Sequence, residues 1–225
     1  MDDCTLKAET ALLERALGYT LCALRPVTPE TLTRPTPCRS WDLRALLWHT
    51  NDSLAALHEG IEEGHVGLAA APQDDDADPA AALRSRASRL LGAWAAAGRR
   101  GNRVVAIADL PLTAAAIART GALEIAVHGW DIAQATGLPR PVPAALATEL
   151  IRTARQLVPA PEARFPLFGP ALTVPAEADP SDRLVAFLGR DPYRGVRTAD
   201  GAEAGTAAGT EPGTEAGTPH DGLNP

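Results

Sequence analysis

The spacing of apolar residues constrains the fold of this chain more than any other feature of its sequence. From Leu6 to Leu24, leucines recur at the three-to-four-residue spacing of one helical face. Residues 41–61, 79–97 and 113–137 predict three further helices. Aromatic residues make up only 4% of the chain, and its apolar residues are mostly Ala and Leu, which favour helices. The sequence therefore predicts an all-α fold built on four long helices.

Capping residues mark the ends of these segments. Ser40 is the expected N-cap of the second helix, with Asp42 near its positive end. Asp78-Pro79 predicts the start of the third helix, and Thr113 predicts the start of the fourth. Gly137 is expected to end the fourth helix.

Pro and Gly interrupt the helical pattern between the segments. Residues 25–40 contain four prolines, which lack a backbone donor, and this stretch is expected to be mainly loop. Residues 98–111 predict a connection with a short extended piece over residues 104–107. The remaining expected elements are a fifth helix over residues 143–157, a loop or short hairpin over 165–175, and a last helix over 181–188.

We expect three parts in the chain. Residues 1–140 form the helical bundle, and residues 141–198 form a helical and irregular extension packed on it. Residues 199–225 repeat Gly-Thr and contain no hydrophobic residue larger than Ala before Leu223. Such a segment buries too little apolar surface to offset its ordering entropy, so we expect a disordered tail.

The charge distribution argues against a nucleic-acid partner. The formal net charge is −7, but residues 200–225 carry five acidic residues and no Lys or Arg. Without them, 23 acidic residues stand against 21 basic ones. A nearly neutral body has no excess of cations to neutralise phosphates.

Cysteine usage and the N-terminus favour a cytoplasmic location. Cys4, Cys22 and Cys38 are an odd number without CxxC spacing, which argues against a disulfide framework and a thiolate zinc site. The N-terminal Met-Asp-Asp has neither a basic nor an apolar leader region, and no stretch approaches 18 apolar residues. We therefore expect neither secretion nor membrane insertion.

Glu124 and His128 lie four residues apart in the predicted fourth helix, one turn apart on the same face. A carboxylate and an imidazole in this arrangement can share a metal ion. Such a pair is more often a hydrogen bond on a solvated face, but here it shares a stripe with Ile117 and Ala135, which points toward the core.

His49 lies on the face of the second helix that carries Leu46 and Leu57. A hydrogen-bonded core histidine is the usual interpretation of such a residue. Inward ligands on two separate helices support each other, however, and three protein ligands leave coordination positions open, as in catalytic metal sites. His49, Glu124 and His128 are therefore the predicted metal ligands.

Two sequence blocks carry a resemblance to a known family. They are Thr36-Pro37-Cys38-Arg39-Ser40-Trp41-Asp42-Leu43-Arg44-Ala45-Leu46-Leu47-Trp48-His49 and Glu124-Ile125-Ala126-Val127-His128-Gly129-Trp130-Asp131-Ile132-Ala133-Gln134-Ala135-Thr136-Gly137. Over residues 5–195 the chain resembles the mycothiol-dependent maleylpyruvate isomerase N-terminal family of the DinB-like superfamily. Phe168-Gly169-Pro170, Asp182-Arg183-Leu184 and Leu188-Gly189-Arg190-Asp191-Pro192 resemble the small actinobacterial branch.

The resemblance implies a DinB-like four-helix bundle with one metal near one end. The family binds it through a His on the second helix and two ligands one turn apart on the fourth, which correspond to His49, Glu124 and His128. Glu rather than His at position 124 matches the isomerase-type members. The metal in such proteins brings a low-molecular-weight thiol, mycothiol in the known cases, to an electrophile.

Other residues near these blocks have weaker claims to a role in the site. Asp131, three residues after His128, is a candidate to orient the His128 ring or a bound water, with a salt bridge or cap as the alternative. Cys38 is expected to be a structural thiol, because no base is expected beside it. Trp41 and Trp130 are expected to pack, His58 to face outward, and Arg39, Arg44 and Arg119 are substrate-binding candidates by proximity in sequence alone.

Three functional hypotheses follow. The first is a metal-dependent thiol transferase or thiol-assisted isomerase, with zinc the first choice and nickel or iron as alternatives. Its partners are a small-molecule substrate and a thiol, and the protein acts as a monomer or homodimer. The second is a metal- or small-molecule-binding protein without turnover. The third is a metal-free polar network of His49, Glu124 and His128 in a structural bundle.

Overall fold

A computed structural model describes residues 3–38, 41–67, 77–97, 101, 103–158, 164 and 168–194. The predicted tail, residues 199–225, lies outside the described residues, as do Arg39 and the expected cap Ser40. The chain divides into two units, residues 1–192 and 193–225, and only Tyr193 and Arg194 of the second are described.

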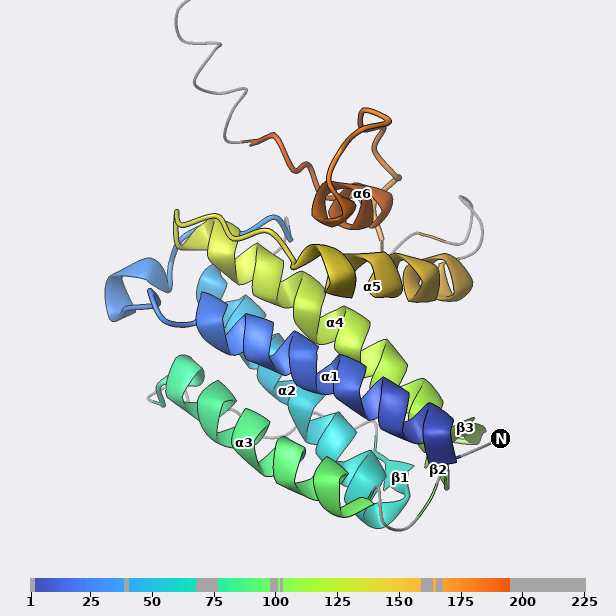
Figure 1. The fold of residues 1–225 in the computed structure, drawn as a ribbon. Helices are drawn as coiled ribbons and strands as arrows, with labels where there is room; N and C mark the ends of the chain where they lie inside the picture. Colours follow the sequence, from blue (N-terminus) through green and yellow to red (C-terminus); the bar gives the residue numbers. More distant parts are fainter. Residues whose placement is uncertain are drawn as a thin grey trace, which may run out of the picture. The chain divides into compact units, whose positions relative to one another are not determined.

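Four long helices form the bundle that the apolar spacing predicts. They are α1 (Asp3–Ala23), α2 (Leu43–Glu63), α3 (Pro79–Ala97) and α4 (Ala114–Ala135). α1 packs along α4, and α2 packs against both α3 and α4 (Figure 1). Their facing leucines are fully buried, including Leu13, Leu17, Leu46, Leu47 and Leu90. The mostly helical fold class is therefore confirmed.

The helix starts follow local capping chemistry. Asp42 is the N-cap of α2 and accepts a hydrogen bond from the backbone N–H of Ala45 at 2.8 Å. The expected start at Trp41 was therefore wrong by two residues, because an Asp in extended backbone geometry caps at least as well as Ser. Thr113 caps α4 as predicted, accepting from the N–H of Ala116 at 3.1 Å.

A small three-stranded sheet in the described part of the chain lies between the C-terminal end of α2 and the N-terminal end of α4. β1 (His65–Val66) follows α2 and pairs in parallel with β2 (Val104–Ile107). β2 pairs in an antiparallel hairpin with β3 (Leu110–Thr113), which leads directly into α4. The extended piece over residues 104–107 is confirmed, whereas β1 and β3 were not predicted. β1 has only two residues, too few to show an alternating pattern, and β3 contains Pro111, a residue that argues against a strand.

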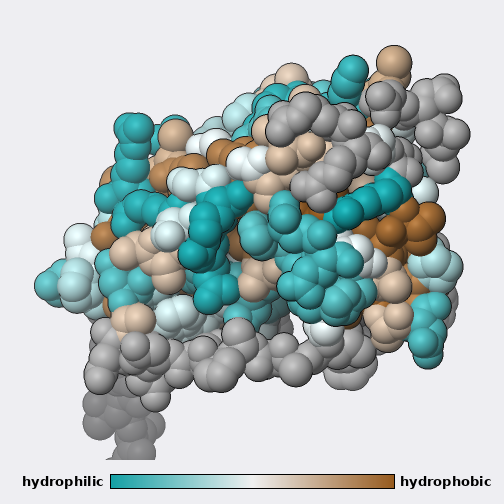
Figure 2. All heavy atoms as spheres, turned by 90° about the horizontal axis from the view of Figure 1, so that it is seen from below, coloured by the Kyte–Doolittle hydropathy of each residue, from teal (hydrophilic) through white to brown (hydrophobic). Residues whose placement is uncertain are grey.

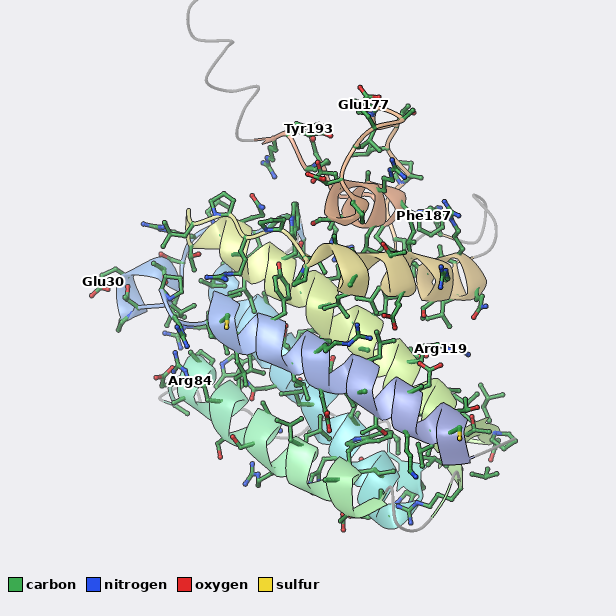
Figure 3. All side chains as sticks on the ribbon, viewed as in Figure 1. Glu30, Arg84, Arg119, Glu177, Phe187 and Tyr193 are labelled. Carbon is green, nitrogen blue, oxygen red and sulfur yellow. The ribbon has the colours of Figure 1, made fainter. Side chains whose placement is uncertain are left out.

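The C-terminal part contains α5 (Ala144–Leu157) and α6 (Pro180–Phe187), close to their expected bounds. α5 packs on α4 and α6 packs on α5 (Figure 1). Phe187, labelled in Figure 3, lies 4.6 Å from the guanidinium of the buried Arg164, which donates to two backbone carbonyls. A short 3₁₀ helix, η1 (Pro29–Thr31), interrupts the predicted loop before α2. The division between bundle and extension at residue 140 stays a prediction.

The hydropathy of the described residues bears on both membrane insertion and the character of the visible surface. No helix in the described part of the chain is both long and apolar enough to cross a bilayer. On the face shown in Figure 2, hydrophilic and hydrophobic residues are mixed.

Candidate metal centre

The structure brings His49, Glu124 and His128 together between α2 and α4. Oε1 of Glu124 lies 2.8 Å from Nε2 of His49 and 3.1 Å from Nε2 of His128. The two imidazole rings meet edge to face, with centroids 5.0 Å apart. One potential ligand atom from each residue lies within 4.8 Å of the other two. Both histidines therefore present the same ring nitrogen, Nε2, to one carboxylate.

Helix geometry explains this convergence. Glu124 and His128 are one turn apart on α4, and His49 faces them from α2, which packs directly against α4. Ser53, one turn after His49, places its hydroxyl 3.3 Å from Oε1 of Glu124 and 3.2 Å from the carbonyl of His49. Ser53 is thus a further polar group beside the three predicted ligands.

Exposure differs strongly across the cluster. The His128 side chain is 7% exposed, whereas those of His49 and Glu124 are 36% and 40% exposed. The cluster is therefore closed on the side of His128 and open to solvent on the side of the other two. An ion held here would keep coordination positions that a small molecule can reach.

Asp131 holds the ring of His128 from the closed side. Its Oδ2 lies 3.0 Å from Nδ1 of His128, and the Asp131 side chain is fully buried. A metal-ligating histidine commonly donates its other N–H to a carboxylate, which fixes the ring and its tautomer. The structure therefore places Asp131 where the sequence analysis expected an orienting residue.

Arg190 neutralises Asp131 and was not singled out by the sequence analysis. Its Nη2 donates to Oδ2 of Asp131 at 2.9 Å, and its Nε lies 3.2 Å from Oδ1. Burial alone would raise the pKa of Asp131, but the charge of Arg190 and the hydrogen bonds from His128 and Arg190 outweigh it and hold that pKa below its usual value. The carboxylate is therefore ionised at neutral pH although it is buried.

Neighbouring charges also shift the pKa values of the predicted ligands Glu124 and His128. Burial opposes ionisation of Glu124, but the charge of His128 and hydrogen bonds from both histidines lower the Glu124 pKa. Burial likewise opposes protonation of His128, but the charge of Glu124 and the hydrogen bond to Asp131 raise the His128 pKa well above its usual value. The centre thus holds ionised carboxylates on both sides of one imidazole.

Cys38 lies closer to this centre than its sequence context indicated. Its Sγ is 3.3 Å from Oδ2 of Asp131 and 3.4 Å from Nη2 of Arg190. The prediction that no base lies beside Cys38 was therefore wrong. Cys38 lies in the loop before α2, and Arg190 lies in the turn after α6. Both contact Asp131 of α4, and local sequence patterns do not predict such long-range contacts.

Two further groups of described residues have metal-compatible spacing. Cys38, His128 and Asp131 form one, but the Arg190 guanidinium contacts two of its three members, and a fixed cation there disfavours a metal ion. The other, Glu59, Glu63 and His65, is largely solvated. The donor set of His49, Glu124 and His128, two imidazoles and a carboxylate, fits a divalent ion best.

The two tryptophans differ in their relation to the site. Trp41 is half-buried, and its ring centroid lies 4.5 Å from that of His49 and 6.2 Å from that of His128. Trp130 is buried in the core, as expected for a packing residue. The Trp41 ring therefore lines one side of the candidate site, in addition to packing on the core.

Arg119, one of the remaining candidates, contacts a residue outside the site. Arg119 on α4 (Figure 3) lies 3.8 Å from Glu9 of α1. Arg44 is exposed on α2, and Arg39 lies outside the described residues. His58 is half-buried and belongs to none of the metal-compatible groups among the described residues.

Comparison with known proteins places these residues in a family. The family model described as mycothiol maleylpyruvate isomerase N-terminal domain matches residues 13–133. Two uncharacterized proteins of Mycobacterium tuberculosis, from two strains, are each 31% identical over 183 residues, which cover 79% of this chain and 94% of the relative. No solved structure gives a significant match. The matched segment contains Cys38, His49, Glu124, His128 and Asp131 but ends before Arg190.

Proposed function

Because the chain belongs to the mycothiol maleylpyruvate isomerase N-terminal domain family, we propose that it is a metal-dependent protein that brings a low-molecular-weight thiol to a small electrophile. The ligands of the metal are His49, Glu124 and His128. The reaction class is thiol transfer or thiol-assisted isomerisation, with a thiol of the mycothiol type.

One observation carries the proposal. Nε2 of His49, Nε2 of His128 and a carboxylate oxygen of Glu124 converge from two helices within the distance that a single ion requires. Two imidazoles and one carboxylate suit zinc, with nickel and iron(II) as alternatives of similar ligand preference. When bound, such an ion lowers the pKa of a thiol, so that thiolate is available at neutral pH.

The residues around the ligands have separable tasks in this proposal. Asp131 and Arg190 close the inner side and keep the His128 ring in one orientation. The exposed sides of His49 and Glu124 leave an approach for the thiol and the electrophile. The Trp41 ring beside His49 provides an apolar surface against which the carbon skeleton of a substrate can pack.

A metal-free polar network is the second candidate function, and a specific observation favours it. Oε1 of Glu124 is within hydrogen-bonding distance of both imidazoles, so the three side chains satisfy one another without an ion. A network of this kind would stabilise the α2–α4 contact in a structural or non-catalytic binding protein.

A thiol-consumption assay tests the catalytic proposal. Zinc-loaded protein is incubated with mycothiol or other small thiols and a panel of electrophiles. Disappearance of free thiol reports thiol transfer, and thiol-dependent conversion of the electrophile reports isomerisation, in which the thiol is regenerated. We expect thiol-dependent turnover by the wild type, loss of turnover in His49→Ala, which removes a ligand atom, and full turnover in the control His58→Ala. Metal binding without turnover on any thiol–electrophile pair would favour a binding protein, and absence of metal would favour the structural network.

A further inference from the structure

We propose that Arg190 is a positioning residue for the metal centre and that the turn after α6 therefore completes the site. Arg190 is not a ligand; it acts through Asp131 on His128. The inference rests on the proposed function, because it assigns a role toward the same metal, and it adds a residue beyond the segment that the family model matches.

The contact between Arg190 and Asp131 has the geometry of a strong ion pair. Nη2 lies 2.9 Å from Oδ2 and Nε lies 3.2 Å from Oδ1, so both carboxylate oxygens are engaged by one planar guanidinium. The Asp131 side chain is 0% exposed and that of Arg190 is 13% exposed. A buried carboxylate without a partner is costly, so Arg190 supplies the charged partner that holds Asp131 in place.

The hydrogen bond to Asp131 determines which nitrogen His128 offers to the metal. Oδ2 accepts from Nδ1 of His128 at 3.0 Å, which assigns the ring hydrogen to Nδ1 when the ring is neutral. The lone pair is then on Nε2, the nitrogen that faces Glu124 and His49. Arg190, Asp131 and His128 thus form a continuous chain from the C-terminal turn to the ligand atom.

The backbone after α6 is built to place Arg190. The N–H of Gly189 bonds to the carbonyl of Ala186 and the N–H of Arg190 bonds to the carbonyl of Val185, the two hydrogen bonds of a Schellman C-cap. Gly189 has φ +82°, and a Cβ there would lie 2.9 Å from the backbone of Gly169. Glycine at 189 therefore lets the chain reverse in a space that admits no side chain.

A purely structural role is the alternative. Arg190 also donates to Sγ of Cys38 and to the carbonyl of Leu188, so its removal would loosen the docking of the C-terminal turn in any case. A structural role predicts a lower thermal midpoint with unchanged metal affinity. A positioning role predicts a loss of metal affinity that depends on Asp131.

The test measures zinc affinity by competition with a chromophoric chelator. The full chain is compared with Arg190→Gln, Arg190→Lys and the control Arg183→Gln, whose exposed guanidinium lies on α6 and contacts the carbonyl of Ala176. We expect Arg190→Gln to weaken zinc binding by about tenfold or more, Arg190→Lys by less, and Arg183→Gln not at all. Should Arg190→Gln not fold, Arg190→Lys carries the same comparison.

A double variant shows whether Arg190 acts through Asp131. If it does, Arg190→Gln combined with Asp131→Asn binds zinc about as weakly as Asp131→Asn alone. Losses that multiply, or a wild-type affinity in both Arg190 variants, overturn the inference while leaving the metal site itself in place. A wild type that binds no zinc overturns the proposed function, and the inference with it.

Discussion

Nε2 of His49 lies 2.8 Å from Oε1 of Glu124, although the two residues are 75 positions apart in the sequence. This contact joins α2 to α4 on the solvent-exposed side of the cluster. It also places the carboxylate of Glu124 between two imidazoles, since His128 lies one turn further along α4. Through this contact, the packing of α2 against α4 brings the three predicted metal ligands together.

Glu124→Gln is expected to weaken metal binding less than loss of an imidazole ligand. The amide retains an oxygen at the ligand position but removes a negative charge, whereas His49→Ala removes a donor atom altogether. Zinc competition titrations of the two variants measure the difference. Equal and complete loss in both would contradict this ranking of the ligands.

Metal affinity is expected to fall as the pH falls. The raised pKa of His128 means that this ring keeps a proton at pH values where an ordinary histidine has lost it, and the metal must displace that proton. The apparent affinity should fall by about tenfold per pH unit while one proton is released. Zinc competition measured over a series of pH values tests the slope, and a flat profile would show that no ligand is protonated in the metal-free protein.

The metal-free protein should show the opposite trend in stability. A folded pKa above the usual 6.5 stabilises the folded state fully below that value, and this contribution is lost as the pH rises through the raised pKa. Thermal midpoints of chelator-treated protein measured across this range give the sign. Stability that increases with pH in the same range would contradict a protonated His128.

Gly129→Ala is expected to destabilise the fold by about 1–3 kcal/mol, because a Cβ there overlaps its neighbours in α1. It would collide with the Thr20 hydroxyl, which donates to the carbonyl of Ile125, and would lie 3.1 Å from the Thr20 Cα. Gly92→Ala in α3 is the matched control, since a Cβ there meets nothing within 4 Å. The control should stabilise by about 0.5–1 kcal/mol through helix propensity. Denaturant unfolding compares the two, and equal effects would show that α1 and α4 do not pack this closely.

Cys38→Ser is expected to retain stoichiometric metal. A serine hydroxyl can still donate to Asp131, and Cys38 is not among the proposed ligands. Metal analysis of the purified variant is the measurement. Complete loss of metal would instead favour the group of Cys38, His128 and Asp131 as the binding site.

Sequence patterns predicted the helices because each long helix repeats its apolar residues over several turns. The ligand pair of Glu124 and His128 was predictable for the same reason, since both lie within one helix at a fixed spacing. His49 required a second step, the assumption that two inward-facing polar residues on separate helices meet. The structure brings them together as expected, and their role as metal ligands stays a prediction.

Arg190 and Cys38 show where sequence reasoning failed. Arg190 is 59 positions from Asp131, and Cys38 is 93 positions from it, so no helical period links them. The only available signal was that Gly189 and Arg190 belong to a block that resembles the family's small branch. Their meeting depends on the docking of loop segments, which tertiary packing alone determines.

The metal content of purified protein tests the central claim most directly. Wild type, His128→Ala and the control His58→Ala are loaded with zinc, freed of excess metal and analysed for bound zinc per chain. The account predicts one zinc per chain in the wild type and in His58→Ala, and almost none in a folded His128→Ala. Equal zinc in all three proteins, or none in the wild type, would contradict a metal centre at His49, Glu124 and His128.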